Sequence, residues 1–178
     1  SFKKSGSYIY LVQVPYSAEL APDWDTFKKN SDALYEANKA GKVLAMYPVG
    51  AGGIAEAVTK MAFGNKIGVQ LTAIPSSATA IGFHRNVNNT IADLFTPLYG
   101  SIIVETDDDK FENNGFVNTT VIRIGNTQKD SIISVAMEGL NPLPLTEISL
   151  DELYGAWDKT LAKVFPPVSA VEPAKKLP

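Results

Sequence analysis

The stretch VLAMYPVGAGGIAEAVTKMAFGNKIG, residues 43–68, decides the fold of this chain. Its first five residues are apolar or aromatic and favour a strand, a glycine-rich turn follows from Pro48 to Gly53, and the remainder has helical periodicity. The apolar side chains of that remainder recur every three or four residues and define one helical face: Ile54, Ala57, Val58, Met61 and Ala62. The sequence therefore predicts a strand, a glycine turn and a helix in direct succession.

Further strands and helices are predicted on both sides of this stretch. Apolar runs bounded by turn residues predict strands at 8–14, 42–47, 67–73, 101–106, 116–124 and 131–137. Helices are predicted at 23–40, capped by Asp23, at 54–63, and at 149–164, where Ser149 and Glu152 form a capping box. A helical turn or two is expected within 90–95. This mixture predicts an α/β sandwich, with a mixed sheet flanked by helices.

Three finer predictions concern how these elements pack. The helix at 23–40 should bury the apolar stripe Phe27, Leu34 and Tyr35. The strand at 42–47 is mostly apolar and should therefore be central in the sheet. The strands at 101–106 and 116–124 should pair as a hairpin, with the acidic residues of the loop between them repelling one another into solvent: Asp107, Asp108 and Asp109.

Length and composition restrict the class of protein. The chain has 178 residues, of which 45% are hydrophobic and 20% charged, enough for one domain with a buried core. A net charge of −3 argues against nucleic acid as a partner, and no apolar run is long enough to span a membrane. The absence of cysteine excludes disulfides, thiolate metal sites and thiol nucleophiles. We expect a cytoplasmic domain at 1–165, followed by a proline-rich linker at 166–178 toward a missing downstream domain.

The glycine turn is the candidate ligand site. Glycines allow a ligand to approach the main chain closely, and free N–H groups at a helix start favour an anion such as phosphate. The turn is neither a Walker A loop, since no Gly-Lys-Ser/Thr follows, nor a Rossmann fingerprint, since Ala55 stands at the third glycine position. The candidate phosphate or nucleotide ligands are Gly50, Ala51, Gly52, Gly53 and Glu56. The alternative interpretation is a tight strand-to-helix connection without a ligand.

Other chemistry-bearing residues give weaker indications. Glu56 could hold a nucleotide's Mg²⁺ or a ligand hydroxyl, or it could be an ordinary first-turn acid that pairs with Lys60. His84 lacks a neighbouring acid or second histidine at metal spacing, and Arg85 beside it could hold a phosphate or remain solvated. The sequence therefore predicts no catalytic residue and no metal site of the chain's own.

Four stretches carry a resemblance to a known family. They are VGAGGIAEAVTKMAFGNKIGVQL at 49–71, FKKSGSYIYLV at 2–12, LFTPLYGSIIVET at 94–106 and LYGAWDKTLAKVFPP at 153–167. In this order they resemble the aminoimidazole ribonucleotide synthetase C-terminal-type domain. More narrowly, they resemble its copy in the second half of the large form of phosphoribosylformylglycinamidine synthase, the formylglycinamide ribonucleotide amidotransferase.

The resemblance implies a function that the residues alone do not. Members of this family are purine-biosynthesis ligases that convert formylglycinamide ribonucleotide, ATP and glutamine to formylglycinamidine ribonucleotide, with Mg²⁺. This chain would supply one wall of a nucleotide or phosphate site, through the glycine turn and Glu56, beside an ATP-binding-type domain and a glutaminase domain. Separated from those domains, this chain would require no cofactor and would be inactive. Related copies carry an Asp where Tyr47-Pro48 stands here, and a structural or dimerisation module without a ligand is the alternative.

Overall fold

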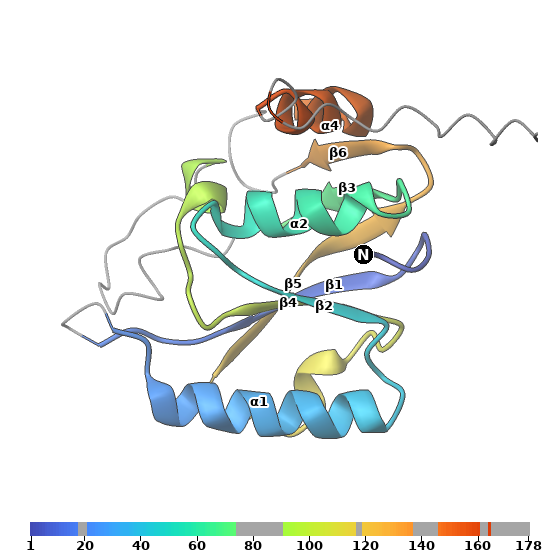
Figure 1. Cartoon of the computed structure of the whole chain (residues 1–178). Helices are drawn as coiled ribbons and strands as arrows, with labels where there is room; N and C mark the ends of the chain where they lie inside the picture. The colour runs from blue at the N-terminus through green and yellow to red at the C-terminus, as the bar shows by residue number, and fades with distance from the viewer. Residues whose placement is uncertain (18–20, 74–90, 117–118, 137–145, 161–163, 165–178) are drawn as a thin grey trace, which may run out of the picture.

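The computed structural model describes residues 1–17, 21–73, 91–116, 119–136, 146–160 and 164. Its elements follow the order β1 (Tyr8–Gln13), α1 (Trp24–Lys39), β2 (Ala45–Pro48), α2 (Gly53–Phe63), β3 (Gly68–Leu71), η1 (Ile91–Phe95), β4 (Ile102–Thr106), η2 (Phe111–Asn113), β5 (Thr120–Gln128), β6 (Ile132–Val135), β7 (Thr146–Ser149) and α4 (Leu150–Asp158) (Figure 1). The predicted strand–turn–helix succession and the α/β class are confirmed. No helix among these residues is long and apolar enough to cross a membrane.

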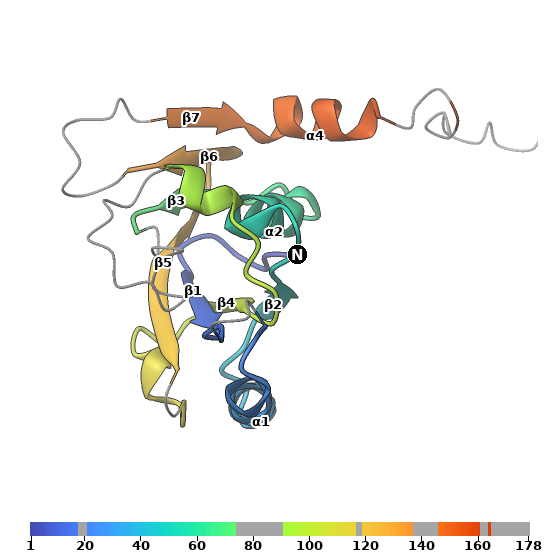
Figure 2. The same cartoon turned by 90° about the vertical axis from the view of Figure 1, so that its left-hand side faces the viewer.

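In the described part of the chain, one mixed seven-stranded sheet has the order β2-β4-β1-β5-β3-β6-β7. Strands β3 and β6 run parallel, and the other neighbours pair antiparallel. The sheet curves around α2, while α1 lies against the opposite face at the β2–β4–β1 end (Figure 2). Alternation along β1 explains the two layers: Ile9 and Leu11 join the core around α2, and Tyr10 and Val12 join the core under α1.

Two predictions about the sheet are wrong. Among the described strands, β2 lies at the edge of the sheet rather than at its centre, because it pairs with β4 alone. Pro48 suits an edge strand, since proline cannot donate a ladder hydrogen bond. Strands β4 and β5 do not form a hairpin, because β1 lies between them and pairs with both. The pairing of β1 joins residues about a hundred positions apart, which local turn residues do not encode.

The acidic loop after β4 lies at the surface, with Asp107 and Asp109 exposed as predicted, but ion pairs that were not predicted also tie it to distant segments. The Asp107 carboxylate pairs with Lys4 at 2.5 Å, and the Asp108 carboxylate lies 3.4 Å from the ammonium of Lys42. Asp108 also accepts hydrogen bonds from the Asn114 side-chain amide and the Lys110 N–H. These bonds, that from Asn114 foremost, lower the pKa of Asp108. Counter-charges from distant segments thus overcome the local repulsion.

Helix α1 is capped as predicted but buries a different face. Asp23 accepts a hydrogen bond from the Thr26 N–H at 2.9 Å, and Gly41 has the left-handed φ of +73° expected after a helix end. Of the predicted stripe only Leu34 is buried, whereas Tyr35 is 63% exposed. The buried residues are Thr26, Asn30, Leu34 and Ala37, a narrow face along one side of the helix.

Helix α4 begins at the predicted cap and differs in its details. The Ser149 hydroxyl accepts from the Asp151 N–H at 3.2 Å, rather than from the N–H of Glu152 as a capping box requires. The described helix ends at Asp158, and residues 161–163, part of its predicted extent, lie outside the described residues.

Candidate functional site

The glycine turn lies at the sheet edge, where β2 ends and α2 begins. Ala51 is exposed, Gly50 and Gly52 are half-buried, and Gly53 is buried. The helix that follows buries the whole predicted face, with Ile54, Ala57, Val58, Met61 and Ala62 no more than 1% exposed. The periodicity argument for this helix is therefore confirmed, and the turn is held at its end by a rigid, fully packed element.

Gly53 is required by packing against the adjacent 3-10 helix. Its φ is +69°, and a Cβ there would overlap the Leu94 carbonyl oxygen and lie 2.7 Å from that of Thr96. Both carbonyls belong to η1 or its end, so the start of α2 and this short helix touch backbone to backbone. The absence of a side chain at Gly53 serves this internal contact.

Glu56 folds back over the turn and occupies the helix start. One carboxylate oxygen accepts the Gly52 N–H at 2.7 Å, and the other accepts from the ammonium of Lys60 at 2.5 Å. A Cβ on Gly52 would lie 2.6 Å from that of Glu56, so this glycine makes room for the acid. The chain's own anion therefore stands where an external anion would be expected.

The turn leaves a few main-chain donors without partners. The Gly53 N–H donates to the Gly50 carbonyl at 3.2 Å, and the Glu56 N–H to the Gly52 carbonyl at 3.3 Å. The N–H groups of Ile54 and Ala55 have no hydrogen-bond partner among the residues that the structure describes. Such unpaired amides at a helix start carry partial positive charge.

The ion pair at the turn shifts two pKa values in opposite directions. The hydrogen bond from Lys60, followed by that from the Gly52 N–H, lowers the pKa of the Glu56 carboxyl. The same bond to Glu56 raises the pKa of the Lys60 ammonium. Both groups therefore stay charged at neutral pH.

We expect the Glu56 contacts to stabilise the fold at neutral pH and to lose that effect in acid. A carboxyl whose pKa is lower in the folded state contributes stability above its unfolded pKa, about 4.3, and loses it as the pH falls through the folded value. Glu56→Gln should therefore reduce the free energy of unfolding at pH 7 more than at pH 3 (about one unit below the unfolded pKa). Carbon-detected NMR titration of the carboxyl checks the shift, and a pKa at or above an ordinary glutamate's would contradict it.

Two further candidate residues from the sequence are not among those that the structure describes. His84 and Arg85 lie outside the described residues. In the described part, no group of three or more histidine or acidic side chains is placed to hold a metal ion. The features that sequence reasoning missed are the η1 carbonyls behind Gly53 and the return of Glu56 onto Gly52, which depend on tertiary packing and on side-chain rotamer.

Comparison with known proteins gives similarity to phosphoribosylformylglycinamidine synthases. No family model matches the sequence. The chain is 30% identical over 182 residues to the phosphoribosylformylglycinamidine synthase subunit PurL of Thermoplasma acidophilum, a match that covers 89% of this chain and 21% of that protein. It thus spans about a fifth of this curated relative, and at this coverage the match includes the glycine turn.

Solved structures share the fold. Thermotoga maritima PurL complexed with AMPPCP superposes with a TM-score of 0.68 and 12% identity, covering 86% of this chain and 26% of that one. PurL complexed with FGAR gives a TM-score of 0.68 and 12% identity, covering 85% and 28%. At this identity the structures establish the fold alone, a mixed sheet with helices on both faces.

Proposed function

We propose, from the premise that this chain is a phosphoribosylformylglycinamidine synthase-type domain, that it forms one wall of a nucleotide- or phosphate-binding site in an ATP-dependent purine-biosynthesis ligase. The parent reaction would convert formylglycinamide ribonucleotide, ATP and glutamine to formylglycinamidine ribonucleotide. The observation that carries the proposal is the 30% identity to the PurL subunit across a match that includes the glycine turn. The stretch at 153–167, which begins within α4, resembles the closing helix of the large form, and we place the domain in the second half of that form.

We assign the ligand wall to Gly50, Ala51, Gly52, Gly53 and Glu56. The exposed Ala51 and the unpaired amides at the start of α2 support an anion at this point. Of these five residues, Glu56 alone has a side-chain oxygen of the kind that Mg²⁺ prefers. Its carboxylate would hold a nucleotide's Mg²⁺ in place of the Lys60 ammonium, while the nucleotide phosphates supply further oxygens.

Removing the Glu56 carboxylate should raise the affinity for an anion without Mg²⁺. In the wild-type chain this carboxylate engages the Gly52 N–H and repels phosphate, so Glu56→Ala should bind ADP or inorganic phosphate about tenfold more tightly. The rise in thermal midpoint with ligand measures this, because a ligand that binds only the folded state stabilises it. Glu36→Ala, an exposed helical acid on α1, is the matched control.

Two further measurements test whether Glu56 holds Mg²⁺ and whether the main-chain amides hold the anion. If Glu56 holds Mg²⁺, Glu56→Ala should lose affinity for Mg-ADP while it gains affinity for ADP in EDTA. Gly52→Val in the Glu56→Ala background should abolish both, since a β-branched side chain covers the amides. A midpoint that no ligand moves in any variant would reject the ligand wall.

The alternative is a structural or dimerisation module whose turn only connects and packs. The observations that favour it are the contact of Gly53 with the η1 carbonyls and the occupation of the Gly52 N–H by Glu56. In that case neither wild type nor Glu56→Ala should bind a nucleotide, and the oligomeric state should depend on concentration.

We expect no turnover from the 178-residue chain by itself. It contains no cysteine to attack glutamine, and by resemblance the opposite wall of the site belongs to an ATP-binding-type domain. A wall with a few backbone donors should hold a nucleotide at best with millimolar affinity, about −4 kcal/mol. The assay combines ATP, Mg²⁺, the formylated ribonucleotide and ammonia. Turnover that survives repurification and disappears in Gly52→Val would contradict this expectation.

A further inference from the structure

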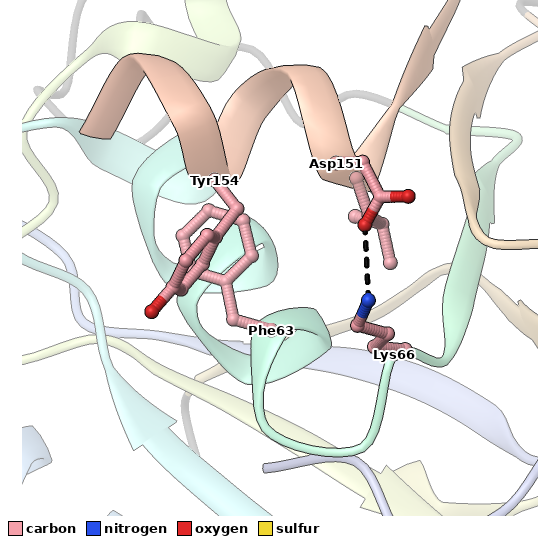
Figure 3. A pocket seen from close by; sticks show the side chains of 5 residues that line it. Phe63, Lys66, Asp151 and Tyr154 are labelled. Carbon is pink, nitrogen blue, oxygen red and sulfur yellow. Dashed lines mark hydrogen bonds and ion pairs between the residues drawn. The ribbon is translucent and has the colours of Figure 1, made fainter. Parts of the chain in front are cut away.

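A second concave feature lies away from the glycine turn, between the end of α2 and the start of α4. It is a hollow of about 330 Å³, lined among the described residues by Phe63, Lys66, Leu150, Asp151 and Tyr154. Figure 3 shows the aromatic rings on one side of the hollow and the charged pair on the other. A volume of this size is at the lower end of those that hold small molecules.

The apolar side of the hollow is a continuous aromatic wall. The rings of Phe63 and Tyr154 pack edge to face with their centroids 5.3 Å apart, and Trp157 lies behind them, 5.8 Å from Phe63 and 5.7 Å from Tyr154. Leu150, 2% exposed, joins this wall to the main core. The three rings contact one another in edge-to-face and tilted arrangements, so they form one contiguous apolar cluster rather than an aromatic cage.

The polar side carries one charge of each sign. The Lys66 ammonium lies 3.1 Å from a carboxylate oxygen of Asp151, with the two side chains 71% and 77% exposed. An ion pair this exposed contributes little to stability, so a ligand that supplies both counter-charges can replace it at small cost. The opposite charges also disfavour a ligand with a single net charge, because one of the two groups would repel it.

The backbone holds both charged residues in place through Ser131. The Ser131 hydroxyl donates to the Lys66 carbonyl at 2.9 Å, and the Ser131 carbonyl accepts the N–H of Leu150 at 3.0 Å. Lys66 has a left-handed φ of +53°, a conformation that non-glycine residues adopt infrequently. At the start of α4, the Ser149 hydroxyl accepts a hydrogen bond from the Asp151 N–H. The Asp151 carboxylate is therefore not needed as the helix cap. One serine therefore links the main chains of the two segments that carry these charges.

We propose that this hollow binds a small zwitterion with an apolar body, of the class of free amino acids with an aromatic or large aliphatic side chain. The ligand carboxylate would pair with Lys66, its ammonium with Asp151, and its side chain would lie on the Phe63–Tyr154 wall. Both charges and the apolar body then meet a complementary surface. This site is separate from the glycine turn and does not depend on the function proposed for it.

The test is an NMR titration of the whole 178-residue chain with L-phenylalanine, observed through backbone amides and the Trp157 indole N–H. We expect saturable shifts at Lys66, Asp151, Tyr154 and Trp157. Phenylalaninamide, which lacks the carboxylate, and 3-phenylpropionate, which lacks the ammonium, should each bind about tenfold more weakly. Equal binding of either single-charge analogue would overturn the zwitterion assignment, and no saturable shift with any of the three would overturn the site.

Variants localise the effect to the two charges. Lys66→Met and Asp151→Asn should each weaken L-phenylalanine binding about tenfold, whereas Lys66→Arg should retain most of it. Lys28→Met breaks another exposed ion pair, that with Asp32 on α1, and is the matched control that should bind like wild type. Thermal unfolding checks that all four fold. Unchanged affinity in both Lys66→Met and Asp151→Asn, or shifts centred elsewhere on the chain, would overturn the proposal.

Discussion

Gly53→Ala should destabilise the chain by roughly 2–5 kcal/mol. Two effects combine at this position. An L side chain is strained at a φ of +69°, and the added Cβ would overlap the Leu94 carbonyl oxygen, which belongs to backbone and cannot rotate aside. Urea unfolding monitored by circular dichroism measures the loss, and an unchanged slope with denaturant would show that the folded state keeps its compactness.

Gly115→Ala separates the two effects. Gly115 has a φ of +80°, and nothing lies within 4 Å of an added Cβ there, so only the left-handed strain applies, about 1 kcal/mol. The difference between the two variants is the cost of pushing η1 away from α2. Equal losses would mean that η1 moves freely, and the Gly53 contact would then not explain this glycine.

Glu105→Ala should destabilise the chain by about 3–5 kcal/mol and release the amino-terminal segment. The Glu105 side chain is fully buried and accepts hydrogen bonds from the main-chain N–H of Lys3 at 2.8 Å, that of Lys4 at 3.3 Å and the Ser7 hydroxyl at 2.7 Å. Its removal leaves the part-buried N–H groups of Lys3 and Lys4 without this acceptor, while the Ser7 hydroxyl keeps the Lys4 carbonyl and the Thr127 hydroxyl as partners. Hydrogen exchange at Phe2 to Ser7 should accelerate together with the drop in unfolding free energy.

Two milder variants calibrate that result. Glu105→Gln keeps one carbonyl oxygen but directs an amide NH₂ at hydrogen-bond donors. It should therefore lower the free energy of unfolding by an intermediate amount, about 1–3 kcal/mol. Asp107→Asn breaks the nearby exposed pair with Lys4 and should cost no more than about 1 kcal/mol. If Glu105→Ala is as mild as Asp107→Asn, the buried carboxylate does not hold the segment.

Sequence reasoning found the glycine turn but not the hollow between α2 and α4. The aromatic residues Tyr154 and Trp157 are three positions apart, a spacing that indicates one helical face. Nothing in that spacing names Phe63 as their partner or sets Lys66 opposite Asp151. Those pairings join residues more than eighty positions apart and exist because α4 packs beside α2.

By itself the sequence determined the local elements of this chain, because helical periodicity, capping side chains and glycine turns act within a few residues. The buried face of α2, the Asp23 cap and the Ser149 cap are all of this kind. Only the tertiary structure decided the strand order, the edge position of β2 and the pairing of the acidic loop with Lys4 and Lys42. The physical reason is that burial and long-range hydrogen bonds are shared between distant segments, so no single segment carries the information that places it.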